Sequence, residues 1–305
     1  MLDLAGIWIP LVTPFAPDGA VDHSGLGGLV DTLAAAGVAG FVVCGSTGEA
    51  AMLEEAEQQD VLRTVLAHAG GRRVVLGVSG IRPDDVARRL RRLEGTALAG
   101  VLVPAPSYVK PSQAGLRDFF AAVADASPCP VLLYDIPSRT GVRSATETML
   151  ALAAHPNIRG VKDCSDDIDH AQVVIDDGRL QLLAGNDHRI FTALCQGAAG
   201  AIAASAHLRP ELFVTLHEAV AHGDLRSARA LWRGLHPLTR VLFEEPNPAP
   251  VKAALADRFG LGDDLRAPMT RASEAQRTRT RAVLAALEGS VAAGRLECRC
   301  QARTA

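Results

Sequence analysis

Lysine is rare in this chain. It occurs only as Lys110, Lys162 and Lys252, and the remaining members of the Lys plus Arg total of 31 are arginines. An amine, unlike a guanidinium, can lose its proton and attack a carbonyl carbon. Lys162 ends the apolar run 158–162, so we expect it at the end of a buried strand, where burial lowers the pKa of an amine. The pattern predicts a nucleophile that forms a Schiff base with a keto acid; the alternative is a structural lysine paired with Asp163 or another carboxylate.

A second candidate group is the segment 45–49, which reads Gly-Ser-Thr-Gly-Glu. Ser46 and Thr47 supply hydroxyls, and Gly48 leaves the neighbouring backbone amides free of bulk. Such a set suits the binding of a carboxylate, although ordinary turns have the same composition.

The chain has two tyrosines: Tyr134 ends a predicted strand, and Tyr108 lies in the segment after another one. Tyr134 is a candidate proton shuttle, with a core or rim residue as the alternative. Arg139, five residues later, is suited to a second carboxylate because its guanidinium can donate two parallel hydrogen bonds. A surface ion pair would explain Arg139 equally well.

These residues need a scaffold that brings strand ends together. Short apolar runs alternate with segments of helical spacing such as 113–126, which predicts an α/β protein. The runs are near-continuous, as in parallel strands buried on both faces. Eight repeats favour a (β/α)8 TIM barrel, whose active site lies at the C-terminal ends of the strands. The expected strands are residues 7–12, 40–44, 73–78, 100–103, 131–134, 158–162, 180–184 and 200–203.

The domain organisation follows from where this alternation stops. We expect the barrel over residues 1–223 and a helical C-terminal region over 224–305, with helices at 224–243, 249–259 and 273–293. An open doubly wound sheet is the alternative fold. It is less favoured because no Gly-x-Gly-x-x-Gly follows the first strand.

Composition narrows the functional classes. The net charge is -3 and 48% of the residues are hydrophobic, which argues against a nucleic-acid or membrane-surface partner. With no signal-type segment or long apolar run, we expect a cytoplasmic protein. The six cysteines lack paired metal spacing apart from Cys298 and Cys300, and we predict no metal site.

Several motifs together resemble the dihydrodipicolinate synthase/N-acetylneuraminate lyase family of class I aldolase-type barrels. The resemblance covers nearly the whole chain. Its motifs are the segments 45–49, 134–141, 160–162, 185–187, 245–252 and 266–269.

The resemblance implies roles for the candidate residues. Lys162 forms the Schiff base with pyruvate without a further cofactor, and Ser46, Thr47 and Gly48 bind the pyruvate carboxylate. Tyr134, Ser46 and Tyr108 form a proton relay, with Tyr108 reaching into a neighbouring subunit of a homotetramer built as a dimer of dimers. Arg139 binds the carboxylate of L-aspartate 4-semialdehyde, and the backbone of Ile202 lines the pyruvate site. The implied product is 4-hydroxy-tetrahydrodipicolinate, on the route to diaminopimelate and lysine.

Departures from the family pattern leave alternatives. Ser46 stands where the synthases commonly have threonine, and Ser107 replaces a tyrosine at the expected dimer contact. Glu55 and Gln58 occupy positions that are histidines in lysine-inhibited members, so we expect weak or no inhibition by lysine. Another pyruvate-dependent enzyme of the family, such as a neuraminate-type or sugar-acid lyase or a keto-acid dehydratase, is the main alternative function. A catalytically silent barrel is less favoured, because the lysine, tyrosines and hydroxyls are all present.

Overall fold

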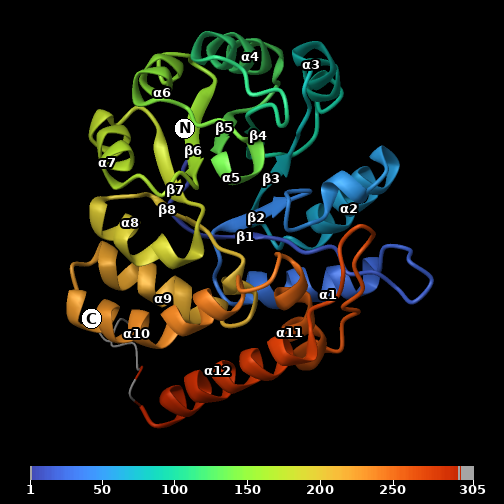
Figure 1. Cartoon of the computed structure of the whole chain (residues 1–305), viewed down its shortest axis with the longest axis vertical. Helices are drawn as coiled ribbons and strands as arrows, with labels where there is room; N and C mark the ends of the chain where they lie inside the picture. The colour runs from blue at the N-terminus through green and yellow to red at the C-terminus, as the bar shows by residue number, and fades with distance from the viewer. Residues whose placement is uncertain (1, 295, 297–305) are drawn as a thin grey trace. The chain divides into compact units, whose positions relative to one another are not determined.

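The computed structural model describes residues 2–294 and 296, so the predicted Cys298 and Cys300 tail lies outside the described residues. Eight parallel strands form a closed barrel in chain order (Figure 1). The predicted TIM barrel is therefore confirmed, and the open doubly wound sheet is wrong. The strands are β1 (Gly6–Pro10), β2 (Gly40–Val43), β3 (Arg73–Gly77), β4 (Gly100–Pro104), β5 (Val131–Asp135), β6 (Ile158–Asp163), β7 (Gln181–Ala184) and β8 (Gly200–Ile202).

Helices separate the strands along the chain, as the spacing of apolar residues predicted. The helices up to the end of the barrel are α1 (His23–Ala35), α2 (Glu55–His68), α3 (Pro83–Arg91), α4 (Gln113–Ala126), α5 (Pro137–Thr140), α6 (Thr146–Leu152), α7 (Ile168–Asp177), α8 (Ile190–Gln196) and α9 (Pro210–Ala221). Short 3-10 turns are η1 (Ala50–Met52), η2 (Asp187–Arg189) and η3 (Ser205–His207). The predicted C-terminal helices are α10 (Leu225–Val241), α11 (Ala249–Phe259) and α12 (Glu274–Ala292).

One compact unit combines the residues up to Ala5 with Arg73–Ile202. Its strands β4 to β7 pair in parallel, with one register shift between Val131 and Leu132 where β5 meets β6. Val131, Leu132 and Leu133 of β5 are almost fully buried. Helices α4, α6 and α7 follow one another beside these strands (Figure 1). Apolar residues follow one another along β4 and most of β5 because both faces of these strands are covered.

The second unit combines Gly6–Arg72 with the chain from Ala203 onward. Within it β1 pairs with β2, α1 packs on α2, and α12 packs on α10 and α11. The helices α10 to α12 thus belong to the same compact unit as the first two strands. The division at residues 223 and 224 that the sequence suggested stays a prediction.

No helix within the described residues is both long enough and apolar enough to cross a membrane.

His207 is a fully buried histidine in the second unit. Its Nδ1 lies 2.8 Å from the carbonyl oxygen of Ala204, and its Nε2 lies 3.3 Å from the backbone nitrogen of Val12. A carbonyl only accepts and an amide only donates, so the partners fix the neutral tautomer with the proton on Nδ1. Burial lowers the pKa of His207 to about 4, although the hydrogen bond to Ala204 acts in the opposite direction.

This histidine predicts a loss of stability in mild acid. The unfolded chain takes up a proton at His207 near pH 6.5, whereas the folded chain resists it down to pH 4. The contribution is therefore complete above pH 6.5, and about 3 kcal/mol is lost as the pH falls towards 4. Denaturant unfolding at pH 7 and pH 4.5 measures it. In His207→Gln, whose amide can keep both hydrogen bonds, the pH dependence should be smaller; equal pH dependence in the two proteins would contradict the assignment.

Candidate active site

Lys162 lies near the C-terminal end of β6, where its side chain is 6% exposed. It is in register with Tyr134 of β5, and parallel partners in register point to the same face of a sheet. The amine Nζ lies 4.3 Å from the centre of the Tyr134 ring. The structure therefore brings the predicted nucleophile and the predicted proton shuttle together in a buried place.

The pKa of Lys162 differs from the expectation. Burial is the largest single influence and lowers the pKa, but Tyr134, Cys164 and Asp187 together outweigh it, so the net shift is upward. The predicted lowered pKa is therefore wrong for the free chain. Sequence reasoning considered burial alone, whereas these three neighbours stabilise the charged amine. A protonated amine must pass its proton on before it can attack a carbonyl.

Two groups at this place were missed as site residues. Asp187 is a buried carboxylate in η2, and the pKa of Lys162 responds to it. Gly185 stands where a Cβ atom would come within 2.4 Å of Cys164 Sγ and 2.9 Å of Lys162 Cγ, so no larger residue fits there. The motif at 185–187 contained both residues, but its letters do not show which strand end the carboxylate approaches.

The loop after β2 carries the predicted carboxylate-binding residues. Ser46 is half-buried, and Thr47 is buried with its Oγ1 accepting a 2.9 Å hydrogen bond from Asn247 Nδ2. A Cβ atom on Gly48 would lie 2.9 Å from the carbonyl oxygen of Leu11, so close packing requires glycine. Because Asn247 donates to Thr47, the hydroxyl proton of Thr47 is left to be donated elsewhere.

Glu49 holds this loop in place. The residue has a left-handed backbone with φ +56°, which is unusual outside glycine. Its carboxylate accepts a 2.7 Å hydrogen bond from Lys252 Nζ and a 3.1 Å hydrogen bond from the backbone nitrogen of Arg266. Both members of the Glu49–Lys252 ion pair are fully buried. Lys252 and Arg266 lie in the C-terminal region, so that region anchors the loop that carries Ser46 and Thr47.

The other predicted site residues occupy three different settings. Arg139, in the short helix α5, is exposed, and in the part of the chain that the structure describes it makes no ion pair. Ile202 is buried at the end of β8. Tyr108 is 90% exposed with φ +71°, and Val109 beside it is 52% exposed. Packing within its own segment does not explain why a tyrosine is so exposed on a left-handed backbone.

Comparison with known proteins gives a consistent result. A model of the dihydrodipicolinate synthetase family matches residues 3–287. The 4-hydroxy-tetrahydrodipicolinate synthase of Sorangium cellulosum is 39% identical over 292 residues, which is 94% of this chain and 97% of that protein.

Solved structures agree with this similarity. The 4-hydroxy-tetrahydrodipicolinate synthase of the methanotroph Methylacidiphilum fumariolicum SolV superposes with a TM-score of 0.91 at 29% identity, covering 95% of this chain and 98% of that one. The dihydrodipicolinate synthase of Acinetobacter baumannii complexed with pyruvate gives a TM-score of 0.90 at 29% identity, covering 93% and 99%.

Proposed function

Because the chain belongs to the dihydrodipicolinate synthetase family, we propose that it condenses pyruvate with L-aspartate 4-semialdehyde to give 4-hydroxy-tetrahydrodipicolinate. The observation that carries the proposal is the buried Lys162 amine beside Tyr134 at the end of β6. The direct test is turnover with both substrates. Formation of the product supports the proposal, and turnover with pyruvate and a sugar-derived aldehyde instead would favour the neuraminate-type alternative.

The chemistry begins at Lys162. Its deprotonated amine adds to the carbonyl carbon of pyruvate, and loss of water leaves an iminium joined to Nζ. Loss of a proton from the pyruvate methyl group gives an enamine, whose carbon adds to the aldehyde of the second substrate and leaves an iminium on Nζ again. The amino group of that substrate then adds to the iminium carbon and displaces Nζ, which closes the ring and frees Lys162. Tyr134, the hydrogen-bonding neighbour of the amine, moves the protons that these steps require.

Substrate binding is assigned to the remaining residues. Ser46, Thr47 and the amide of Gly48 bind the pyruvate carboxylate, and the hydroxyl proton that Asn247 leaves free on Thr47 supports this role. The backbone of Ile202 lines the same substrate. Arg139 binds the carboxylate of the semialdehyde, and its lack of an ion pair among the described residues leaves its guanidinium available.

Assembly is a further part of the proposal. Tyr108 completes the relay with Ser46 and Tyr134 from a neighbouring copy in a homotetramer. The exposed ring of Tyr108 and the exposed Val109 support a partner that covers them. The cytoplasmic location and the weak response to lysine stay predictions.

Replacing Tyr134 by phenylalanine tests the relay. The ring that packs beside Lys162 is kept and only the hydroxyl is lost, so we expect kcat to fall by about 10²–10⁴-fold. Steady-state kinetics with both substrates measures this effect, and the midpoint of thermal unfolding checks that packing is retained. An unchanged kcat in a folded Tyr134→Phe protein would remove Tyr134 from the relay.

Replacing Arg139 by alanine tests the choice of second substrate. We expect the KM for the semialdehyde to rise by about 10–100-fold, because a charge-assisted hydrogen bond contributes about 1.5–3 kcal/mol. The KM for pyruvate should change little. Arg117, another exposed arginine in the same compact unit, provides the matched control as Arg117→Ala. Equal changes for both substrates would argue against a role specific to the semialdehyde.

A further inference from the structure

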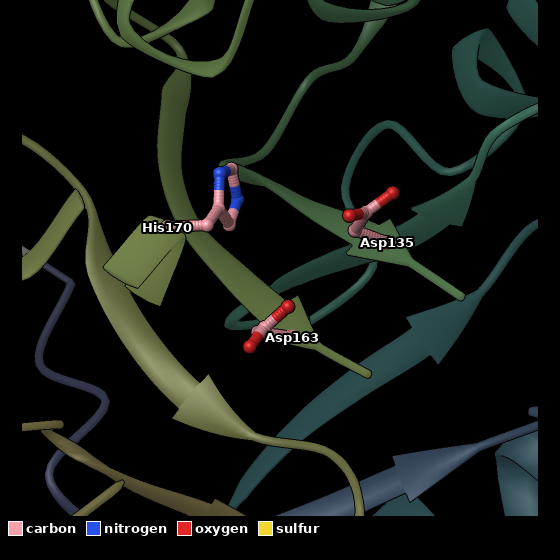
Figure 2. A group of neighbouring side chains, drawn as sticks. All are labelled: Asp135, Asp163 and His170. Atoms are coloured by element: carbon pink, nitrogen blue, oxygen red, sulfur yellow. The ribbon is translucent and has the colours of Figure 1, made fainter. Parts of the chain in front are cut away.

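Next to Tyr134 and Lys162, the proposed catalytic pair, lies a second pair of side chains on the same two strands. Asp135 of β5 is in register with Asp163 of β6, one residue beyond the Tyr134 and Lys162 pair. Successive side chains of a strand point to opposite faces, so the two carboxylates point away from the face that carries Lys162. His170 of α7 lies beside them, and Figure 2 shows the three side chains around a common space.

The three side chains are close but not bonded to one another. One potential ligand atom from each lies within 4.8 Å of the others. Among the hydrogen bonds of the described residues, none joins Asp135, Asp163 and His170 directly. The space between them is therefore of the size that a small ion or a water molecule occupies.

One polar atom of each side chain is held by a hydrogen bond. The partners are Ser144 N to Asp135 Oδ1 at 3.1 Å, Ser165 N to Asp163 Oδ1 at 3.0 Å, and Thr146 Oγ1 to His170 Nδ1 at 2.9 Å. Each side chain is thereby oriented, and each has a second polar atom besides the one in that hydrogen bond. Metal-binding histidines commonly have their second nitrogen held in this way.

Asp135 supplies an independent sign of a missing partner. The side chain is 2% exposed, and its Oδ2 is buried with no hydrogen-bond partner. A buried carboxylate oxygen without a partner is costly, and a bound cation removes that cost.

The surrounding charges permit a cation. Arg143 lies near enough to affect the pKa of both Asp135 and His170, but its guanidinium is paired with Asp167 at 2.7 Å. Glu147 adds a further negative charge on the side of His170.

We propose that Asp135, Asp163 and His170 form a binding site for a divalent first-row metal ion, for which Mn²⁺ and Zn²⁺ are the probes. Two carboxylate oxygens and one imidazole nitrogen are donors that both ions accept, with water completing the coordination. The ion ties the ends of β5 and β6 to α7 on the side of the strands away from Lys162. Its expected effect is on stability rather than on the chemical step.

Metal binding by the full chain tests the proposal. After treatment with a chelator and its removal, isothermal titration with Mn²⁺ should show one ion per chain with a Kd in the micromolar range or below. The midpoint of thermal unfolding should rise by a few degrees with saturating Mn²⁺. For Zn²⁺, a Cys298→Ser/Cys300→Ser chain is used, because thiolates bind this ion strongly on their own.

Substitutions test whether Mn²⁺ binds at these three residues and not elsewhere on the chain. Asp135→Asn and His170→Gln should each weaken Mn²⁺ binding by at least 10-fold, whereas Asp166→Asn, an exposed acid three residues from Asp163, should not. If a variant fails to fold, the electron paramagnetic resonance spectrum of Mn²⁺ bound to the unaltered chain is recorded instead. This spectrum should show nitrogen coordination from one imidazole. Absence of stoichiometric binding, binding that survives both variants, or a spectrum without nitrogen would overturn the proposal and leave water or a proton as the occupant.

Discussion

Replacing Lys162 by alanine should abolish turnover and prevent any covalent adduct with pyruvate. The alanine protein has no amine at the end of β6, so the iminium and the enamine derived from it cannot form. We expect kcat to fall by at least about 10⁴-fold, because the loss removes the covalent route itself. Reduction with borohydride in the presence of pyruvate, followed by peptide mass mapping, should place the adduct on Lys162 in the unaltered chain and show none in Lys162→Ala.

Two further substitutions make this result specific. Lys162→Arg keeps a positive charge beside Tyr134 and Asp187 but lacks an amine that can form an imine, so it should be as inactive as Lys162→Ala. Lys110→Ala removes an exposed lysine and should retain the adduct. An adduct that persists in Lys162→Ala would assign the Schiff base to another amine and would remove the proposed mechanism.

The fold was predictable because local signals agreed with one another. The helix expected at residues 113–126 has those bounds in the structure, since the Ser112 side chain caps its start by accepting from the nitrogen of Gly115. The helix expected at 249–259 also matches, because Gly260 ends it in a left-handed conformation with φ +69°. The short helix α5 was missed, since four residues are too few to show a helical period.

The site was predictable only in part. Lys162 and Tyr134 were placed correctly at adjacent strand ends because the barrel fixes where strands end. The direction of the Lys162 pKa was wrong, because Tyr134 raises this pKa most, and Cys164 and Asp187 add to the upward shift against the effect of burial. Asp187 lies 25 positions after Lys162 in the chain, and the sequence pattern did not show that the two interact. Single-sequence patterns report local periodicity and do not report which distant groups meet.

Lys252 illustrates the same gap more strongly. Its rarity raised the question of a special role, but the sequence offered no sign that it pairs with Glu49, 203 positions away. The structure gives the amine Nζ a second acceptor, the carbonyl oxygen of Thr13 at 2.9 Å, and places it 4.2 Å from the Phe15 ring centre. Thr13 in turn donates to the carbonyl oxygen of Gly48 at 2.7 Å. The lysine therefore stabilises the backbone of the proposed carboxylate-binding loop through its hydrogen bonds to Glu49 and Thr13.

Replacing Lys252 by methionine should cost about 3–5 kcal/mol of unfolding free energy. The change keeps most of the apolar stem of the side chain but removes the ammonium group that pairs with Glu49. The Glu49 carboxylate then stays buried without its ion-pair partner, and breaking a buried ion pair in this way costs about 3–5 kcal/mol. Urea unfolding at pH 7 measures the difference. The exposed pair Arg258 and Glu288 provides the control, since Arg258→Met should change the free energy by less than about 1 kcal/mol.

The double variant Lys252→Met/Glu49→Gln separates stability from function. Neutralising Glu49 removes the unpaired charge, so the double variant should lose less stability than the sum of the two single variants. The KM of the double variant for pyruvate should be higher than that of the unaltered chain. The reason is that residue 49 no longer holds the backbone next to Ser46, Thr47 and Gly48 with a charged hydrogen bond. Strictly additive losses of stability would show that the two side chains are not coupled. Recovery of both stability and KM in the double variant would show that the ion pair stabilises the fold without shaping the loop.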